Sequence, residues 1–145
     1  DVYKRQTTDR RHGFIRKWAA TDAARHDGRE LPRLLDRANT GSAVWADTAY
    51  RSRRNEAHMA KRGLRSQVHF RKPPGKPLPA PRARANAARS AVRSAIEHVF
   101  AHQKGPMALF VRTIGIARAR TKIGMANLAY NLTRFVWQQG RGVPA

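Results

Sequence analysis

The chain has 145 residues, enough for one domain with a hydrophobic core. Lys and Arg number 30 against 9 Asp and Glu, so the formal net charge is +21, and we expect a polyanionic partner rather than an acidic small substrate. The absence of Cys excludes disulfides and thiolate metal sites. No apolar run approaches the roughly 18 residues of a membrane span, and the N-terminus has no apolar export signal. On charge alone, a ribosomal-type or merely basic protein is the alternative.

The first part of the chain predicts a hairpin and then a helix. Residues 12–20, HGFIRKWAA, mix aromatic and β-branched side chains, so we expect a strand that is the second arm of a hairpin turning near 9–13. Residues 28–38 carry Leu and Ala at helical spacing, with Asp27 as the N-cap.

A strand, a helix and a strand are predicted next. AVWA at 43–46 indicates a buried strand that ends at Asp47. A helix is expected over 53–62, capped by Ser52 and ended by a glycine. RSQVHF at 65–70 indicates another short strand. The residues of the helix expected to face inward are Ala57, Met59 and Ala60.

The second half predicts a loop and two helices. Residues 71–83 combine prolines and cations, so we expect a basic loop without regular structure between a strand and helix core at 7–70 and C-terminal helices at 84–137. An extended piece is expected within 105–115. The first helix, 84–103, has an apolar stripe of Ala88, Val92, Ala95, Ile96, Val99 and Phe100. The second, 116–137, carries Ile116, Ile123, Leu128, Leu132 and Phe135.

Two carboxylates lie where α/β folds place chemistry. Asp47 follows a predicted strand, and Glu97 lies inside a helix that can pack on the sheet. Magnesium prefers such hard oxygen ligands, and a two-metal site needs carboxylates that converge from distant positions. From the residues alone, the favoured interpretation of Asp47 is a turn or cap residue, and Glu97 can be an exposed carboxylate paired with Arg93 at i−4.

Several segments resemble those of a known protein family. VWADTAYRSRRNEA, residues 44–57, is similar to the second-aspartate segment of bacterial insertion-sequence DDE transposases of the insertion sequence five group. RSAIEHVFAHQK, residues 93–104, resembles their third-acid segment. Residues 9–28 and 114–135 are also similar to this group, so the resemblance covers nearly the whole chain beyond its first few residues.

The third-acid segment also resembles a signature of the wider insertion sequence four superfamily, Tyr-x2-Arg-x3-Glu-x6-Lys. Arg93, Glu97 and Lys104 fall at the required spacing. Ser90 stands at the tyrosine position, so the signature is incomplete there. This departure concerns the role of the tyrosine and not the metal ligand.

The resemblance implies an α/β catalytic domain with a ribonuclease H-like fold. In that family two Asp and one Glu bind two Mg²⁺ (or Mn²⁺) ions, and phosphodiester bonds are cut and joined in line. Asp47 would be the second acid and Glu97 the third, both as catalytic residues and as metal ligands. The first acid belongs on an earlier strand, and we find it at none of Asp9, Asp22 and Asp27. We therefore expect an N-terminally truncated piece of the catalytic domain, with the first strand missing, an exposed apolar strand edge, C-terminal helices and little or no activity alone.

The resemblance also implies partners and a location. The partner is DNA, as transposon ends and as target, in the bacterial cytoplasm near the nucleoid; no membrane is involved, and a homodimer is left open for the full-length form. Positive charge near the two acids would contact phosphates rather than form a solvated face. The residues expected to do so are Arg51, Arg53, Arg54, Arg71, Lys72, Lys76, Arg93 and Lys104.

Two other interpretations stay open. One is a basic nucleic-acid-binding protein without enzymatic activity, in which Asp47 and Glu97 are structural. The other is a nuclease of the same fold class, which only its reaction products would distinguish from a transposase.

Overall fold

The architecture is mixed α/β, as the sequence predicts, with two separate two-stranded sheets. The computed structural model describes residues 2–22, 26–39, 41–107 and 115–141. None of the helices in these ranges is both long and apolar enough to cross a membrane. Most of the extended piece expected within 105–115 lies outside the described residues.

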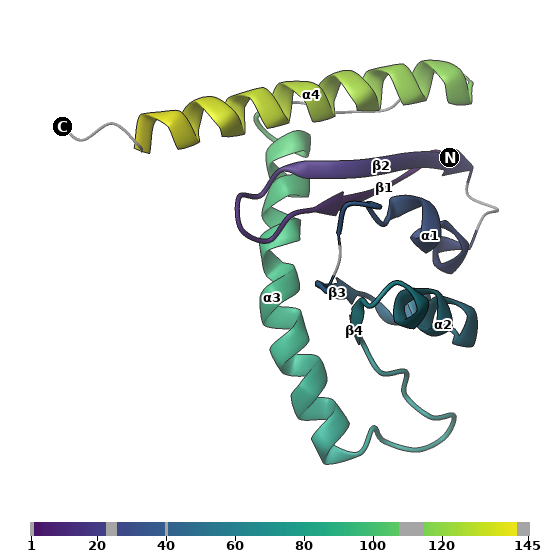
Figure 1. Ribbon diagram of the computed structural model, residues 1–145. Coiled ribbons are helices and arrows are strands. Elements are labelled where there is room, and N and C mark those ends of the chain that lie inside the picture. Colours follow the sequence, from purple (N-terminus) through teal and green to yellow (C-terminus); the bar gives the residue numbers. More distant parts are fainter. Residues whose placement is uncertain (1, 23–25, 40, 108–114, 142–145) are drawn as a thin grey trace. The chain divides into compact units, whose positions relative to one another are not determined.

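The chain forms two compact units. One comprises residues 1–24 and 96–145, and the other comprises residues 25–95. Helix α3 (Ala80–Lys104) belongs to both, because the division falls within it (Figure 1).

The predicted hairpin is present in the first unit. Strands β1 (Val2–Thr8) and β2 (Ile15–Asp22) pair antiparallel. Asp9 organises the turn, because its Oδ1 accepts a hydrogen bond from His12 N–H (2.7 Å) and its Oδ2 one from Phe14 N–H (2.9 Å). Asp9 is therefore a turn residue, and Asp22, expected after the hairpin, is the last residue of β2.

Helix α4 (Ile116–Arg141) packs against β2, and a side-chain amide hydrogen-bonds to the strand backbone. The Asn131 amide accepts from Ile15 N–H and donates to Ile15 C=O, both at 2.9 Å. Gly124 admits the Trp18 ring, since a Cβ there would lie 3.0 Å from it. The buried residues of the helix are Ala119, Ile123, Asn127 and Tyr130.

The predicted apolar face of this last helix is mostly wrong. Of its five members only Ile123 is buried, whereas Leu128, Leu132 and Phe135 are each more than half exposed. The hairpin contacts the side of α4 that carries Tyr130 and Asn131, and both side chains hydrogen-bond to it. The inward face therefore combines apolar residues, Ala119 and Ile123, with polar ones.

The helix predicted at 28–38 is much shorter in the structure. A 3₁₀ turn, η1 (Asp27–Glu30), leads into a single helical turn, α1 (Leu31–Leu34). Asp27 is not the N-cap, since His26 holds that position and makes no side-chain cap. Leu35 has an extended backbone that ends the helix, and its side chain is still buried in the core.

The strand–helix–strand unit is confirmed with small changes of length. Strands β3 (Ala43–Ala46) and β4 (Arg65–Val68) pair in parallel, joined through α2 (Arg53–Lys61). Ser52 caps α2 by accepting from Asn55 N–H at 3.2 Å, as predicted. Strand β3 is only half-buried, and β4 ends two residues earlier than expected.

The core of the second unit is small and apolar. Met59, fully buried in α2, packs with Leu31, Leu35, Leu64 and Val68. The other inward residue of α2 is Asn55, whose amide donates to the carbonyls of Gly28 (2.7 Å) and Tyr50 (2.8 Å). Ala57 and Ala60, predicted to face inward, are exposed.

Helix α3 begins at Ala80, within the segment expected to be a loop. Pro81 lies in the first turn, where a missing N–H costs no helical hydrogen bond. In its predicted apolar stripe Val99 is buried, Val92 and Phe100 are half-buried and Ala88 is exposed; the side chains of Ala95 and Ile96 lie outside the described residues.

Candidate metal and nucleic-acid site

Two polar residues follow the paired ends of the parallel strands. Ala46 and Val68 are the last pair of β3 and β4, and Asp47 and His69 come next. His69 N–H donates to Ala46 C=O at 3.0 Å, which extends the ladder by one hydrogen bond. The carboxyl ends of parallel strands are where α/β folds collect functional side chains.

Asp47 is exposed, and among the described residues only one of its two carboxylate oxygens accepts hydrogen bonds that stabilise the fold. It caps the 3₁₀ turn η2 (Thr48–Tyr50), with Oδ1 accepting from the N–H and from the hydroxyl of Thr48 (3.1 Å for the hydroxyl). Both bonds go to Oδ1, so within the described part of the chain Oδ2 has no hydrogen-bond donor. The turn-residue and metal-ligand interpretations of Asp47 are therefore compatible.

Glu97 is an exposed residue of α3. It lies in the unit formed by residues 1–24 and 96–145, whereas Asp47 lies in the other unit. Helical geometry places Glu97 on one stripe of α3 with Asn86, Ser90 and Arg93, at positions i, i+4, i+7 and i+11. No group of three or more metal-ligating side chains occurs among the described residues.

His69 is a buried histidine, 6% exposed, that contacts this stripe. Its Nδ1 lies 3.3 Å from Arg93 Nη1, and its Nε2 lies 3.3 Å from Ser90 Oγ. Burial, followed by the positive charge of Arg93, lowers the pKa of His69, and the charge of Asp47 and a backbone hydrogen bond with Asn86 oppose this. The ring is therefore favoured in its neutral form.

The lowered pKa of His69 predicts a pH-dependent stability. Below about pH 6.5, the ordinary value for histidine, the unfolded chain binds a proton that the folded chain resists. We expect the free energy of unfolding to fall as the pH drops through this range and to be unaffected by His69 above it. Urea titrations from pH 8 to 5 should show a smaller fall in a His69→Asn variant. Equal falls in both proteins would contradict this.

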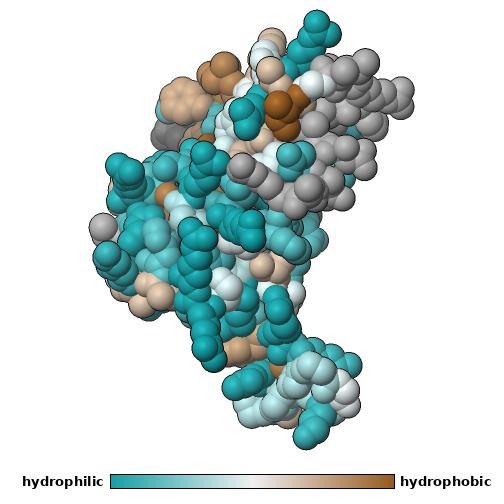
Figure 2. Space-filling model, turned by 90° about the vertical axis from the view of Figure 1, so that its right-hand side faces the viewer, coloured by the Kyte–Doolittle hydropathy of each residue, from teal (hydrophilic) through white to brown (hydrophobic). Residues whose placement is uncertain are grey.

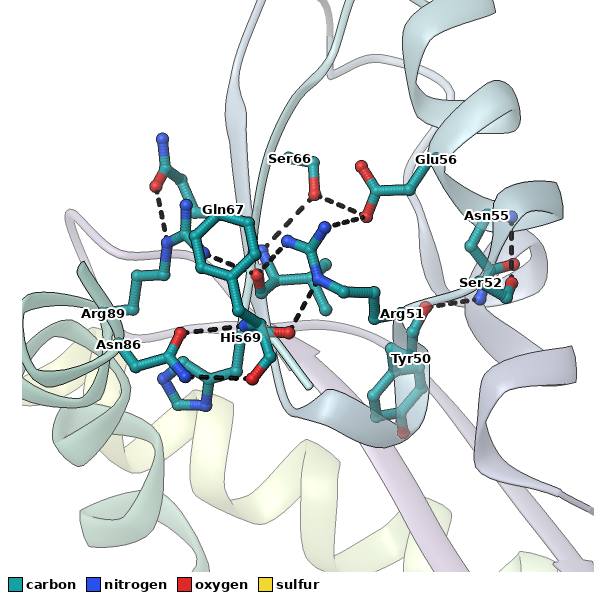
Figure 3. Close-up of polar contacts among 12 residues, drawn as sticks. Tyr50, Arg51, Ser52, Asn55, Glu56, Ser66, Gln67, His69, Asn86 and Arg89 are labelled. Atoms are coloured by element: carbon teal, nitrogen blue, oxygen red, sulfur yellow. Dashed lines mark hydrogen bonds and ion pairs between the residues drawn. The ribbon is translucent and has the colours of Figure 1, made fainter. Parts of the chain in front are cut away.

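Three arginines, among them Arg51 and Arg89 (Figure 3), place a guanidinium over the ring of Phe70. The guanidinium carbons of Arg51 and Arg89 lie 4.5 and 4.4 Å from the centre of its ring. Both arginines donate to the carbonyl of Val68, Arg89 at 2.8 Å, and Arg51 also donates to His69 C=O at 2.7 Å. Arg51 was expected to contact DNA, but this structure uses its guanidinium to hold the end of β4.

Asn86 fixes the same segment to α3. Phe70 N–H donates to its Oδ1 at 2.8 Å, and its Nδ2 donates to Phe70 C=O at 3.0 Å. The amide thus takes the place of a neighbouring strand, as Asn131 does at Ile15. The residues after β4 are therefore tied to the helix that carries the signature.

The remaining predicted DNA contacts are mostly available to solvent. Arg93 is half-buried; Arg53, Arg54, Arg71, Lys72, Lys76 and Lys104 are exposed. The face shown in Figure 2 is covered largely by hydrophilic side chains.

Sequence reasoning missed His69, Asn86 and Arg89. The strand predicted at 65–70 includes the histidine, whereas β4 ends at Val68. A detectable signal existed: in a strand–helix–strand unit, polar residues directly after both strands meet at one edge. The hydrogen bonds that Asn86 and Arg89 make to the backbone after β4 are tertiary contacts, which no local sequence pattern shows.

Comparison with known proteins gives the family. Residues 3–132 match the family model described as Transposase DDE domain, so the chain belongs to this family of insertion-sequence DDE transposases. It is 29% identical over 98 residues to the transposase for insertion sequence element IS1106 of Neisseria meningitidis serogroup B. That alignment covers 68% of this chain and 34% of the relative, so the chain matches about a third of the relative's length. No solved structure matches significantly.

Proposed function

We propose that this chain is part of the catalytic domain of a DNA transposase and contributes two acids and a DNA-binding surface to it. The observation that carries the proposal is Asp47, placed after a parallel strand with one carboxylate oxygen unused among the described contacts. Membership of the DDE family and a net charge of +21 support it. In the whole protein the reaction would be the cutting and joining of phosphodiester bonds.

The residues fit the metal that such a reaction needs. Asp47 and Glu97 supply exposed carboxylates, the hard oxygen donors that Mg²⁺ or Mn²⁺ prefers. The ions, when bound, would activate the attacking hydroxyl and stabilise the leaving oxygen. Asp47 is oriented for this by Thr48, which holds Oδ1 and leaves Oδ2 free to bind.

The first acid of the family's three would come from outside the described residues. We propose a ribonuclease H-like sheet that includes a further strand, and this strand carries the first Asp. The two separate sheets support this, since each pairs only two of the described strands. An unpaired strand edge exposes backbone N–H and C=O groups, which proteins ordinarily pair or cover.

A non-enzymatic DNA-binding module is the second candidate. It is favoured by the net charge of +21, which suits a polyanionic partner and requires no catalysis. In that case the exposed cations would bind phosphates and the carboxylates would serve the fold alone.

DNA binding can be tested with two lysines in matched positions. Lys104 ends α3 and is a proposed phosphate contact; Lys61 ends α2 and is not, and both are exposed. We expect Lys104→Met to weaken binding to duplex DNA and to reduce the slope of log affinity against log salt by about one. Lys61→Met should change neither by a comparable amount. Fluorescence anisotropy over a salt series measures both quantities.

Two outcomes would contradict the proposal. If the wild-type chain shows no salt-dependent affinity for DNA, the proposed function is wrong for this chain. If Lys61→Met and Lys104→Met lose equal affinity, the binding is a general effect of charge, and the proposed surface is wrong.

A further inference from the structure

We propose that His69 is a positioning residue that orients the guanidinium of Arg93 for a DNA phosphate. The inference rests on the proposed function, since it takes Arg93 as a phosphate contact. It adds a residue outside the Arg, Glu and Lys signature, at the end of a different element.

The chemistry of its two partners determines the state of the ring. A guanidinium can only donate hydrogen bonds, so Nδ1 of His69 must accept from Arg93 Nη1. The proton of the neutral ring is then on Nε2, which can donate to the hydroxyl of Ser90. His69 is therefore a neutral acceptor for Arg93.

The backbone beside His69 is held on several sides. Its own N–H continues the ladder to Ala46, and its carbonyl accepts from Arg51. The amide of Asn86 brackets the next residue, Phe70. The ring is thus a fixed acceptor at the edge where Asp47 lies.

A fixed acceptor on one Arg93 nitrogen restricts the rotamers of a long side chain. Arginine loses appreciable side-chain entropy when it binds, and a guanidinium oriented beforehand loses less of it. Four of its five N–H groups stay available for a phosphate. Ser90, at the tyrosine position of the signature, makes the second contact to the ring.

Two amide substitutions test the roles of the two ring nitrogens of His69 separately. His69→Asn can present an oxygen near the place of Nδ1 and so keeps an acceptor for Arg93. His69→Gln reaches the place of Nε2 and keeps a partner for Ser90 only. Each is measured for duplex DNA affinity with wild-type Arg93 and with Arg93→Met, and circular dichroism checks that each variant folds.

We expect His69→Gln to bind DNA about threefold to tenfold more weakly than wild type, the range expected when one hydrogen bond is lost. His69→Asn should stay close to wild type. In the Arg93→Met background both substitutions should have little further effect, because the group they position is gone. A purely structural role of His69 would not produce this dependence on Arg93.

The outcomes separate this inference from the proposed function. If wild type binds DNA but the Asn and Gln variants bind equally well, or lose affinity equally with and without Arg93, the inference is overturned and the proposed function stands. If wild type does not bind DNA, both are overturned. If a variant unfolds, the tautomer of His69 is measured instead, by nitrogen NMR of wild type at about pH 8, above the ordinary histidine pKa. A proton on Nδ1 overturns the inference. An unprotonated Nδ1 supports it.

Discussion

Met59→Ala is expected to destabilise the unit of residues 25–95 by about 2–5 kcal/mol, the usual cost of removing a large buried side chain. Met59 is fully buried in the small cluster that also contains Leu31, Leu64 and Val68. A core of this size has few other contacts to compensate for the cavity. Val44 and Ala46 of β3 pack against the same cluster, so the support of Asp47 should weaken with it.

The matched control is Met125→Ala, the same substitution at a side chain that is 68% exposed on α4. It should change stability by less than about 0.5 kcal/mol. Amide hydrogen exchange of β3 and β4 reports the unfolding of the Met59 unit separately from the rest. If both substitutions cost the same free energy, the cluster around Met59 is not the core of this unit.

Asp47→Asn is expected to lower the affinity for Mn²⁺ by more than about tenfold. Even groups that only orient a metal ligand contribute about that much, so a direct ligand should contribute at least as much. Glu97→Gln should have a similar effect. Affinity for DNA without metal should be unchanged or slightly higher, because a negative charge near the phosphates has been removed.

Asp22→Asn is the control for charge, since Asp22 is an exposed acid at the end of β2 and is not a proposed ligand. Calorimetric titration with Mn²⁺ compares the three variants with wild type. If Asp22→Asn lowers the affinity as much as Asp47→Asn does, the metal is held by general surface charge, and the proposed ligands are wrong.

Local patterns predicted the elements whose signals lie within a few residues. The second arm of the hairpin was predicted from its aromatic and β-branched residues, next to a turn that Asp9 closes with its own carboxylate. The start of α2 follows from Ser52, whose hydroxyl is a local cap. The two strands of the parallel pair were predicted as the short segments AVWA and RSQVHF on either side of a helix.

The errors arose where tertiary contacts override those signals. Leu31 and Leu35 share helical spacing, yet Leu35 reaches the core from an extended backbone after one helical turn. The inward side of α4 includes Asn131, whose amide makes two hydrogen bonds to the backbone of Ile15. Periodicity of apolar residues cannot detect either effect.

The candidate site was predictable only in part, because some of its residues are brought together by tertiary contacts. Asp47 and Glu97 were found through the resemblance of their segments, and the end of a predicted strand gave Asp47 an independent basis. Arg51 lies in one of those segments too, but its guanidinium holds Val68 and His69. His69 was missed because the predicted strand extended to residue 70 and so placed the histidine inside it, whereas β4 ends at Val68.

The most direct test of the proposed metal ligands is whether Asp47 and Glu97 each bind Mn²⁺ in preference to other exposed acids. Small amounts of Mn²⁺, added to the wild-type chain, broaden the NMR signals of residues close to the ion. We predict that the signals of Thr48, beside Asp47, and of His98, beside Glu97, broaden at a lower Mn²⁺ concentration than those of residues next to Asp22. Broadening at only one of the two proposed ligands, or at all exposed acids alike, would contradict the assignment.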